Sequence, residues 1–154
     1  MRIRQGDLRD LQAIREIVER AYELYIERIG ARPAPMNDDY AEKLRQGHVF
    51  LAEEDGVIGL VVLVGESDHL LIENVAVDPR RQGTGVGRLL LDYAEAHARR
   101  HHIPTVRLYT NAAMWENLTL YHHLGYREYD RRREHGFERV FLSKPVQPRQ
   151  ESQT

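Results

Sequence analysis

Residues 77–90 read VDPRRQGTGVGRLL, and this stretch says most about the fold. An apolar segment, residues 70–77, leads into it, and an amphipathic helical pattern follows it. The alternating glycines let the backbone adopt unusual φ angles and lie close to a ligand. The first N–H groups of a helix have no partner inside the helix, and the helix dipole adds about half a positive charge there. The order strand, glycine turn and helix therefore predicts a site for a phosphate or pyrophosphate.

The spacing of the glycines excludes two common phosphate-binding loops. The dinucleotide motif G-x-G-x-x-G requires a glycine where Arg88 stands. The P-loop motif requires Gly-Lys five and six residues after its first glycine, but Arg88 and Leu89 occupy those positions after Gly83. With these two motifs excluded, residues 82–87 fit the pattern Q-x-x-G-x-G. A glycine-rich connection without a ligand is the alternative, although glycines at a helix start lower stability without a compensating role.

Length and composition narrow the class of protein. The chain has 154 residues, a common length for one domain, with 42% hydrophobic residues and a net charge of −2. This charge gives no general attraction to nucleic acid. The absence of cysteine excludes disulfides, thiolate metal sites and a cysteine nucleophile. The only lysines, Lys43 and Lys144, are interpreted as a compositional bias towards arginine and not as functional residues.

No sequence signal for a membrane or for export is evident. The longest apolar runs are far too short to cross a bilayer, and no apolar segment of a signal peptide follows residues 1–5. We therefore expect a soluble cytoplasmic protein with no membrane partner.

Hydrophobic periodicity and turn residues predict an α/β fold with the order β-α-α-β-β-β-α-β-α-β-β. Asp7 is expected to cap the first helix and Asn37 the second. We expect a single domain over residues 1–146 and a flexible tail over residues 147–154. The predicted strands cover residues 3–5, 49–52, 57–64, 70–77, 106–110, 126–132 and 137–143, and the predicted helices end near Arg28, Gly47, His101 and Leu124.

The loop resembles the acyl-CoA loop of the GNAT superfamily of N-acyltransferases. The pattern Q-x-x-G-x-G at residues 82–87 carries the resemblance, together with the preceding Val-Asp-Pro and the following Arg-Leu-Leu. The predicted element order is also that of this family, so the resemblance covers nearly the whole chain. It implies a mixed, mostly antiparallel sheet of about seven strands with four helices. It also implies that the fourth and fifth strands splay apart to admit acyl-CoA.

The resemblance implies a donor site for acetyl-CoA and no metal. In such a site the pantetheine arm is bound by the backbone of Val75 and Val77, and the Val75 N–H polarises the thioester carbonyl. A donor of this kind contributes about 3 kcal/mol in other acyl transfers. The pyrophosphate would lie on the backbone amides of the loop, namely Gln82, Gly83, Thr84, Gly85, Val86, Gly87 and Arg88.

Tyr121 is the candidate general acid. Residues 120–126 read LYHHLGY and resemble the family signature L-Y-x-x-x-G-[FY]. In the family this phenol lies near the CoA sulfur and can protonate the leaving thiolate. A thiol has a pKa near 8.5, so protonation helps but is not obligatory. The alternative is a core tyrosine on the apolar face of its helix.

One position departs from the family pattern. An asparagine often stands seven residues before this tyrosine and contacts CoA, but Met114 occupies that position here. Residues 114–121 instead resemble M-x-E-N-x-x-L-Y, a pattern of bacterial members. Asn117 is thus the candidate replacement contact, and a helix-surface asparagine is the alternative.

Glu73 is the candidate general base. A lysine-like amine titrates near 10.4, so freeing its lone pair at pH 7 costs roughly 4–5 kcal/mol. Glu73 lies on the strand that would border the active site. The alternatives are that it binds the charge of the substrate or pairs with an arginine.

The acceptor pocket is expected under the first helix and the loop after it. We expect Tyr25 and Met36, with Glu73, to bind the acceptor, in a group that also includes Tyr22, Pro33 and Pro35. The alternative is that the two tyrosines belong to the core stripe of the helix. Four of the eight histidines form two adjacent pairs, His101-His102 and His122-His123, whose members do not share a helix face. His97 and His101 have i,i+4 spacing but lie on an exposed-looking turn, so no metal site is expected.

These features predict an N-acetyltransferase that moves an acetyl group from acetyl-CoA to a primary amine by direct attack in a ternary complex. A small molecule or amino acid is the preferred acceptor. A protein or peptide acetyltransferase and a non-catalytic acyl-CoA sensor remain alternatives. A homodimer is possible, and no nucleic acid partner is expected. The sequence does not identify the acceptor.

Overall fold

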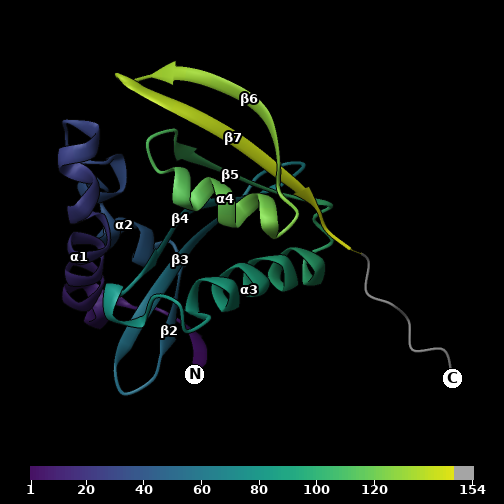
Figure 1. The fold of residues 1–154 in the computed structure, drawn as a ribbon. Coiled ribbons are helices and arrows are strands. Elements are labelled where there is room, and N and C mark those ends of the chain that lie inside the picture. The colour runs from purple at the N-terminus through teal and green to yellow at the C-terminus, as the bar shows by residue number, and fades with distance from the viewer. Residues whose placement is uncertain (148–154) are drawn as a thin grey trace, which may run out of the picture.

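The computed structural model describes residues 1–147, which form one seven-stranded sheet with helices on both faces (Figure 1). The strand order is β1-β2-β3-β4-β5-β7-β6. The strands are β1 (Arg2–Gln5), β2 (Val49–Glu53), β3 (Val57–Gly65), β4 (Leu70–Val77), β5 (Thr105–Asn111), β6 (Arg127–Glu134) and β7 (Phe137–Pro145). The α-helices are α1 (Leu11–Ile29), α2 (Tyr40–Arg45), α3 (Val86–Arg100) and α4 (Trp115–His123), and short 3-10 turns are η1 (Leu8–Asp10), η2 (Ala34–Asn37) and η3 (Pro79–Arg81).

The two central strands separate from each other, as predicted. β4 and β5 run parallel, whereas every other neighbouring pair is antiparallel. Their pairing joins only residues 70–72 to residues 106–108. From Glu73 onward β4 continues beside β3 alone, so a gap opens between β4 and β5. The mixed, mostly antiparallel sheet is confirmed.

Two hydrophobic layers hold the helices on the sheet. Residues of α1 and α2 pack on one face with Leu60 and Val62, whereas α3 packs on the other face with Val61 and Leu63. This division follows from the period of two in β3, which sends successive side chains to opposite faces. Figure 1 shows α1 and α2 together at one side and α3 and α4 at the other.

A β-bulge in β4 changes which face its side chains reach. Val62 pairs with Asn74 but Leu63 pairs with Ile72, so Glu73 is an extra residue with no partner in β3. Such an extra residue shifts the alternation of the strand by one. Ile72 accordingly packs in the α3 layer, while Asn74 is buried on the opposite side, bonded to tyrosines of α1 and α2.

Helix starts differ from the predictions in two places. Asp39, and not Asn37, caps α2, because its carboxylate accepts the Glu42 N–H at 3.1 Å while Asn37 belongs to η2. Asp7 caps the short turn η1, and α1 begins after it at Leu11. Both helices still end close to the predicted residues.

Within residues 1–147, no helix has both the length and the apolar character needed to cross a bilayer. The predicted flexible tail, residues 147–154, lies outside the described residues apart from Gln147.

The close approach of β3 to α3 depends on Gly59. A Cβ at Gly59 would lie 3.0 Å from Val86 Cγ1 and 3.1 Å from the Ala76 carbonyl oxygen, whereas a Cβ at Gly65 on the same strand would meet nothing within 4 Å. Gly59→Ala is therefore expected to lower the free energy of unfolding by about 1–3 kcal/mol through overpacking. Gly65→Ala should change it by less than about 1 kcal/mol. Urea unfolding measures both, and equal effects would contradict this packing.

Candidate functional site

A cavity occupies the gap between β4 and β5. About 610 Å³ of space is free of protein atoms here, part of it open to solvent, which is within the usual range of a ligand site. Four predicted site residues, Glu73, Val75, Asn117 and Tyr121, meet at this cavity. Its lining comprises Tyr22, Pro33, Ala34, Pro35, Ile72, Glu73, Asn74, Val75, Leu108, Tyr109, Thr110, Asn111, Met114, Asn117, Tyr121, Phe137 and Arg139.

The free edge of β4 turns backbone donors towards this gap. The Asp78 N–H donates to the Ile58 carbonyl at 2.9 Å, which fixes the residues of β4 whose backbone faces β3. Because backbone groups alternate in direction along an antiparallel strand, the N–H groups of Val75 and Val77 face away from β3. These groups lie beyond the last residue paired with β5. They can therefore bond an extended ligand as a further strand would.

The glycine turn leaves the start of α3 without a capping side chain. Gly83 and Gly85 have φ of 81° and 88°, a region that side chains with a Cβ rarely adopt. The first backbone bond of the helix runs from the Leu89 N–H to the Gly85 carbonyl, at 3.0 Å. The N–H groups of residues 86–88 consequently have no acceptor within the helix. They form a site for an anion.

Asp78 fixes the entry to this turn. It is buried, and its carboxylate accepts from the Arg80 backbone N–H and from the Arg80 guanidinium. The bond from the guanidinium lowers the pKa of Asp78 to about 2, against the opposite effect of burial. The carboxylate stays ionised at neutral pH, and its bonds to Arg80 hold the turn that directly follows β4.

Tyr121 carries its proton at neutral pH. It is buried on α4, and burial raises the pKa of its phenol to about 12. Its ring meets the Tyr126 ring edge-on, with 5.9 Å between centroids. A phenol in this state can donate a proton into the cavity.

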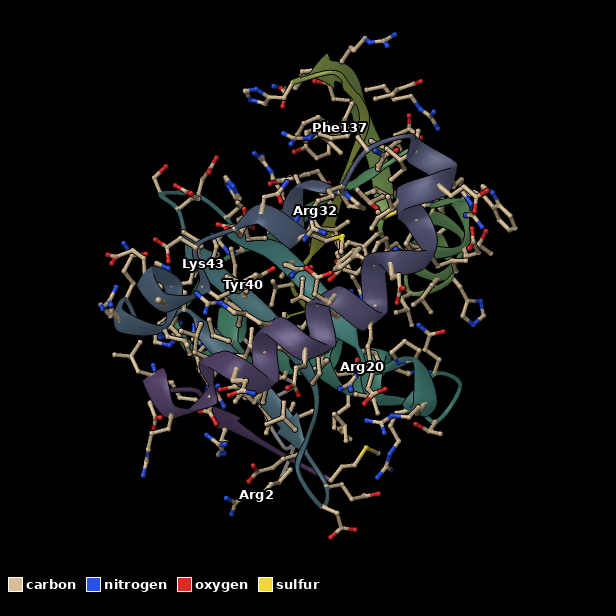
Figure 2. The ribbon with its side chains drawn as sticks, turned by 90° about the vertical axis from the view of Figure 1, so that its left-hand side faces the viewer. Arg2, Arg20, Arg32, Tyr40, Lys43 and Phe137 are labelled. Atoms are coloured by element: carbon tan, nitrogen blue, oxygen red, sulfur yellow. The ribbon has the colours of Figure 1, made fainter. Side chains whose placement is uncertain are left out.

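Glu73 forms an ion pair with Lys43 of α2. The Glu73 side chain is 21% exposed and the Lys43 side chain 18%. Figure 2 shows Lys43 beside Tyr40, both on α2. Of the alternatives for Glu73, pairing within the protein therefore occurs, but with a lysine instead of an arginine. Sequence reasoning missed Lys43, although its being one of two lysines in an arginine-rich chain was a usable signal.

Asn74 joins three elements above the cavity. The Tyr22 hydroxyl donates to the Asn74 side-chain oxygen and also contacts the Val75 carbonyl oxygen at 3.1 Å. The Asn74 amide donates to the Tyr40 hydroxyl at 2.9 Å, and this hydroxyl donates to the Pro35 carbonyl at 2.6 Å. The network links α1, α2 and η2 to β4 and so fixes the cover of the cavity. No pattern in the sequence indicates this network, since the bulge alone turns Asn74 to this face.

The residues predicted to bind the acceptor divide between the cavity and the core. Tyr22, Pro33 and Pro35 line the cavity, whereas Tyr25 and Met36 lie in the layer under α1 and are not part of the lining. The acceptor roles of Tyr25 and Met36 stay predictions.

The α4 end of the cavity holds the residues that depart from the family pattern. Met114 and Asn117 both line the cavity, with the Asn117 amide 3.8 Å from the Met114 sulfur. The CoA role of Asn117 also stays a prediction.

No metal centre is evident in the described part of the chain. The His97 and His101 rings lie with their centroids 4.4 Å apart and their planes tilted by 40°. Across residues 1–147 no three or more histidine, aspartate or glutamate side chains are grouped so that they could hold a metal ion.

Comparison with known protein families agrees with this geometry. The family model for the acetyltransferase (GNAT) domain matches residues 45–128, more than half of the chain. The chain belongs to the GNAT acetyltransferase family. The predicted family is confirmed.

A curated relative and two solved structures extend this result. Mycothiol acetyltransferase from Thermomonospora curvata is 37% identical over 83 residues, which is 53% of this chain but only 28% of the relative. The PaiA N-acetyltransferase of Thermoplasma acidophilum in complex with coenzyme A has a TM-score of 0.79 at 16% identity, covering 94% of this chain and 98% of that one. The ribosomal-protein-alanine N-acetyltransferase of Brucella melitensis has a TM-score of 0.73 at 21% identity, covering 95% and 100%. At these identities the solved structures establish the fold alone.

Proposed function

We propose that this GNAT protein transfers an acetyl group from acetyl-CoA to the primary amine of a small molecule or amino acid, by direct attack in a ternary complex. One observation carries the proposal: Glu73, Val75 and Tyr121 line a single cavity at the point where β4 and β5 part. We also propose that residues 1–146 form a single domain, because one sheet includes strands from Arg2 to Pro145.

The residues at the donor end fit acetyl-CoA. The outward N–H groups of Val75 and Val77 suit the amides of a pantetheine arm, and the uncapped start of α3 suits a pyrophosphate. Asn117 lines the same cavity as Val75 and Tyr121, and we propose that it contacts the arm. The coenzyme A in the Thermoplasma acidophilum structure supports the same ligand class.

Three groups of this chain would act on the reacting atoms. The Val75 N–H donates to the thioester oxygen as negative charge develops there, a contribution of about 3 kcal/mol in other acyl transfers. Tyr121 donates its proton to the departing sulfur. Glu73, held by Lys43, accepts the proton of the acceptor amine directly or through water.

The enclosed acceptor end favours a small acceptor over a protein surface. Pro33, Ala34 and Pro35 cover one side of the cavity, and Phe137 and Arg139 of β7 bound another. Figure 2 shows Phe137 above the loop that carries Arg32. Because both segments line the cavity, this end favours a small molecule or an extended terminus over a folded protein surface.

A thiol-release assay with acetyl-CoA over amines, amino acids and peptides tests the proposal. We expect turnover with small amines or amino acids and little with peptides. Turnover with peptides alone would favour a protein acetyltransferase. Binding of acetyl-CoA without turnover on any acceptor would favour a sensor.

Gly85→Ala tests the donor loop, with Gly30→Ala as its matched control. Both glycines have positive φ, 88° and 81°, and a Cβ at either would meet nothing within 4 Å. Each substitution is expected to cost about 1–2 kcal/mol of stability through backbone strain. Only Gly85→Ala should also weaken coenzyme A binding, by roughly tenfold, as measured by calorimetry. Equal binding by the two variants would contradict the loop assignment.

Tyr121→Phe tests the general acid. The variant keeps the buried ring but loses the proton donor, so kcat should fall roughly 100-fold while the Kd for coenzyme A changes little. Because the pKa of Tyr121 is about 12, wild-type kcat should show no loss from ionisation of this phenol between pH 7 and 9. Unchanged kcat in the variant would remove Tyr121 from this role.

A further inference from the structure

The acceptor end of the cavity carries two opposite charges. Among the described residues that line the cavity, only Glu73 and Arg139 are charged. Glu73 comes from the bulge of β4 and Arg139 from β7, on the far side of β5. A negative and a positive group therefore face one enclosed space from opposite strands.

Each of these groups uses part of its bonding capacity on a partner that does not line the cavity. Lys43 contacts one carboxylate oxygen of Glu73. Glu134 accepts from one terminal nitrogen of Arg139 at 3.1 Å, and within residues 1–147 the structure records no other hydrogen bond for this guanidinium. A guanidinium has five N–H donors in a planar fork, so a second edge remains for a bidentate anion.

The surroundings hold Arg139 in place. Its guanidinium lies over the Tyr109 ring, 4.9 Å from the centroid, and its side chain is only 15% exposed. A largely buried and oriented guanidinium binds a carboxylate more strongly than a solvated one, because solvent screens the interaction less.

Asp38 does not line the cavity but interacts with both Lys43 and Arg139. Its carboxylate is 4.0 Å from the Lys43 ammonium, and Lys43 and Arg139 both oppose the rise in its pKa that burial causes. The described residues contain no ion pair between Asp38 and Arg139. Asp38 thus interacts with both cations from outside the lining, and among the described residues it takes none of the remaining N–H donors of Arg139.

We propose that the acceptor carries a carboxylate as well as its amine, with Arg139 binding the carboxylate and the amine lying on the Glu73 side of the cavity. This inference rests on the proposed function. It narrows the acceptor to amino acids and other small molecules that carry both a primary amine and a free carboxylate. A purely cationic amine gains nothing from Arg139 and is repelled by it. The apolar Pro33, Pro35 and Phe137 would contact the remainder of the acceptor.

The test compares each amino acid with its own amide, which keeps the amine and side chain but removes the negative charge. In the wild type, kcat/KM should be higher for the acid. In R139Q, the ratio of acid to amide should fall by about 30-fold or more, as expected for loss of one partner of a desolvated charge pair. R139K, which keeps the charge but not the planar fork, should recover part of this ratio.

R132Q is the matched control. Arg132 lies on the same hairpin and contacts the same Glu134, at 3.3 Å, but it does not line the cavity. R132Q should therefore leave the ratio of acid to amide unchanged, and thermal unfolding of each variant checks that the hairpin stays folded.

The outcomes separate this inference from the proposed function. Amines without an acid group acetylated as well as the acids, or an equal loss for acid and amide in R139Q, would overturn the acceptor class and leave the acetyltransferase intact. Absence of turnover on every amine would overturn both.

Discussion

The early end of the pairing between β4 and β5 is the constraint on which the site depends. A strand whose neighbour leaves it exposes unpaired N–H and C=O groups, which are a ready template for another extended chain. Here the exposed edge begins at Glu73 and lies inside the fold instead of at its rim. A ligand with amide groups can complete the sheet at this position, and helices on either side limit what else can reach it.

The bulge at Glu73 makes this edge useful for chemistry. One extra residue turns Asn74 towards α1 and leaves Glu73 and Val75 on the cavity. Asn74 in turn bonds Tyr22 of α1 and Tyr40 of α2. The bulge therefore positions both the reacting groups on β4 and the helices that cover the cavity. The ion pair belongs to the same arrangement, since Lys43, which pairs with Glu73, lies on the same helix as Tyr40, which bonds Asn74.

Local patterns could be predicted from the sequence and long-range partners could not. The glycine turn, the strand before it and the helix after it are contiguous, so spacing alone identified them. Tyr121, which lines the cavity, lies in a contiguous motif that resembles the family signature, so the sequence indicates this position. Lys43, Asn74 and Arg139 are joined to the site by a bulge and by sheet order, and neither leaves a pattern in nearby residues. Asn37, Asp38 and Asp39 are all residue types that can cap a helix, and only the fold shows that Asp39 caps α2.

Amide hydrogen exchange at β4, read residue by residue by NMR, tests the central claim most directly. By the alternation of the strand, Asn74 and Ala76 bond to β3 while Val75 and Val77 face the gap. The N–H groups of Val75 and Val77 should exchange faster than those of Asn74 and Ala76 in the free protein. Coenzyme A should slow Val75 and Val77 selectively. Protection of all four groups before addition, or no change at Val75 and Val77 upon binding, would contradict the account.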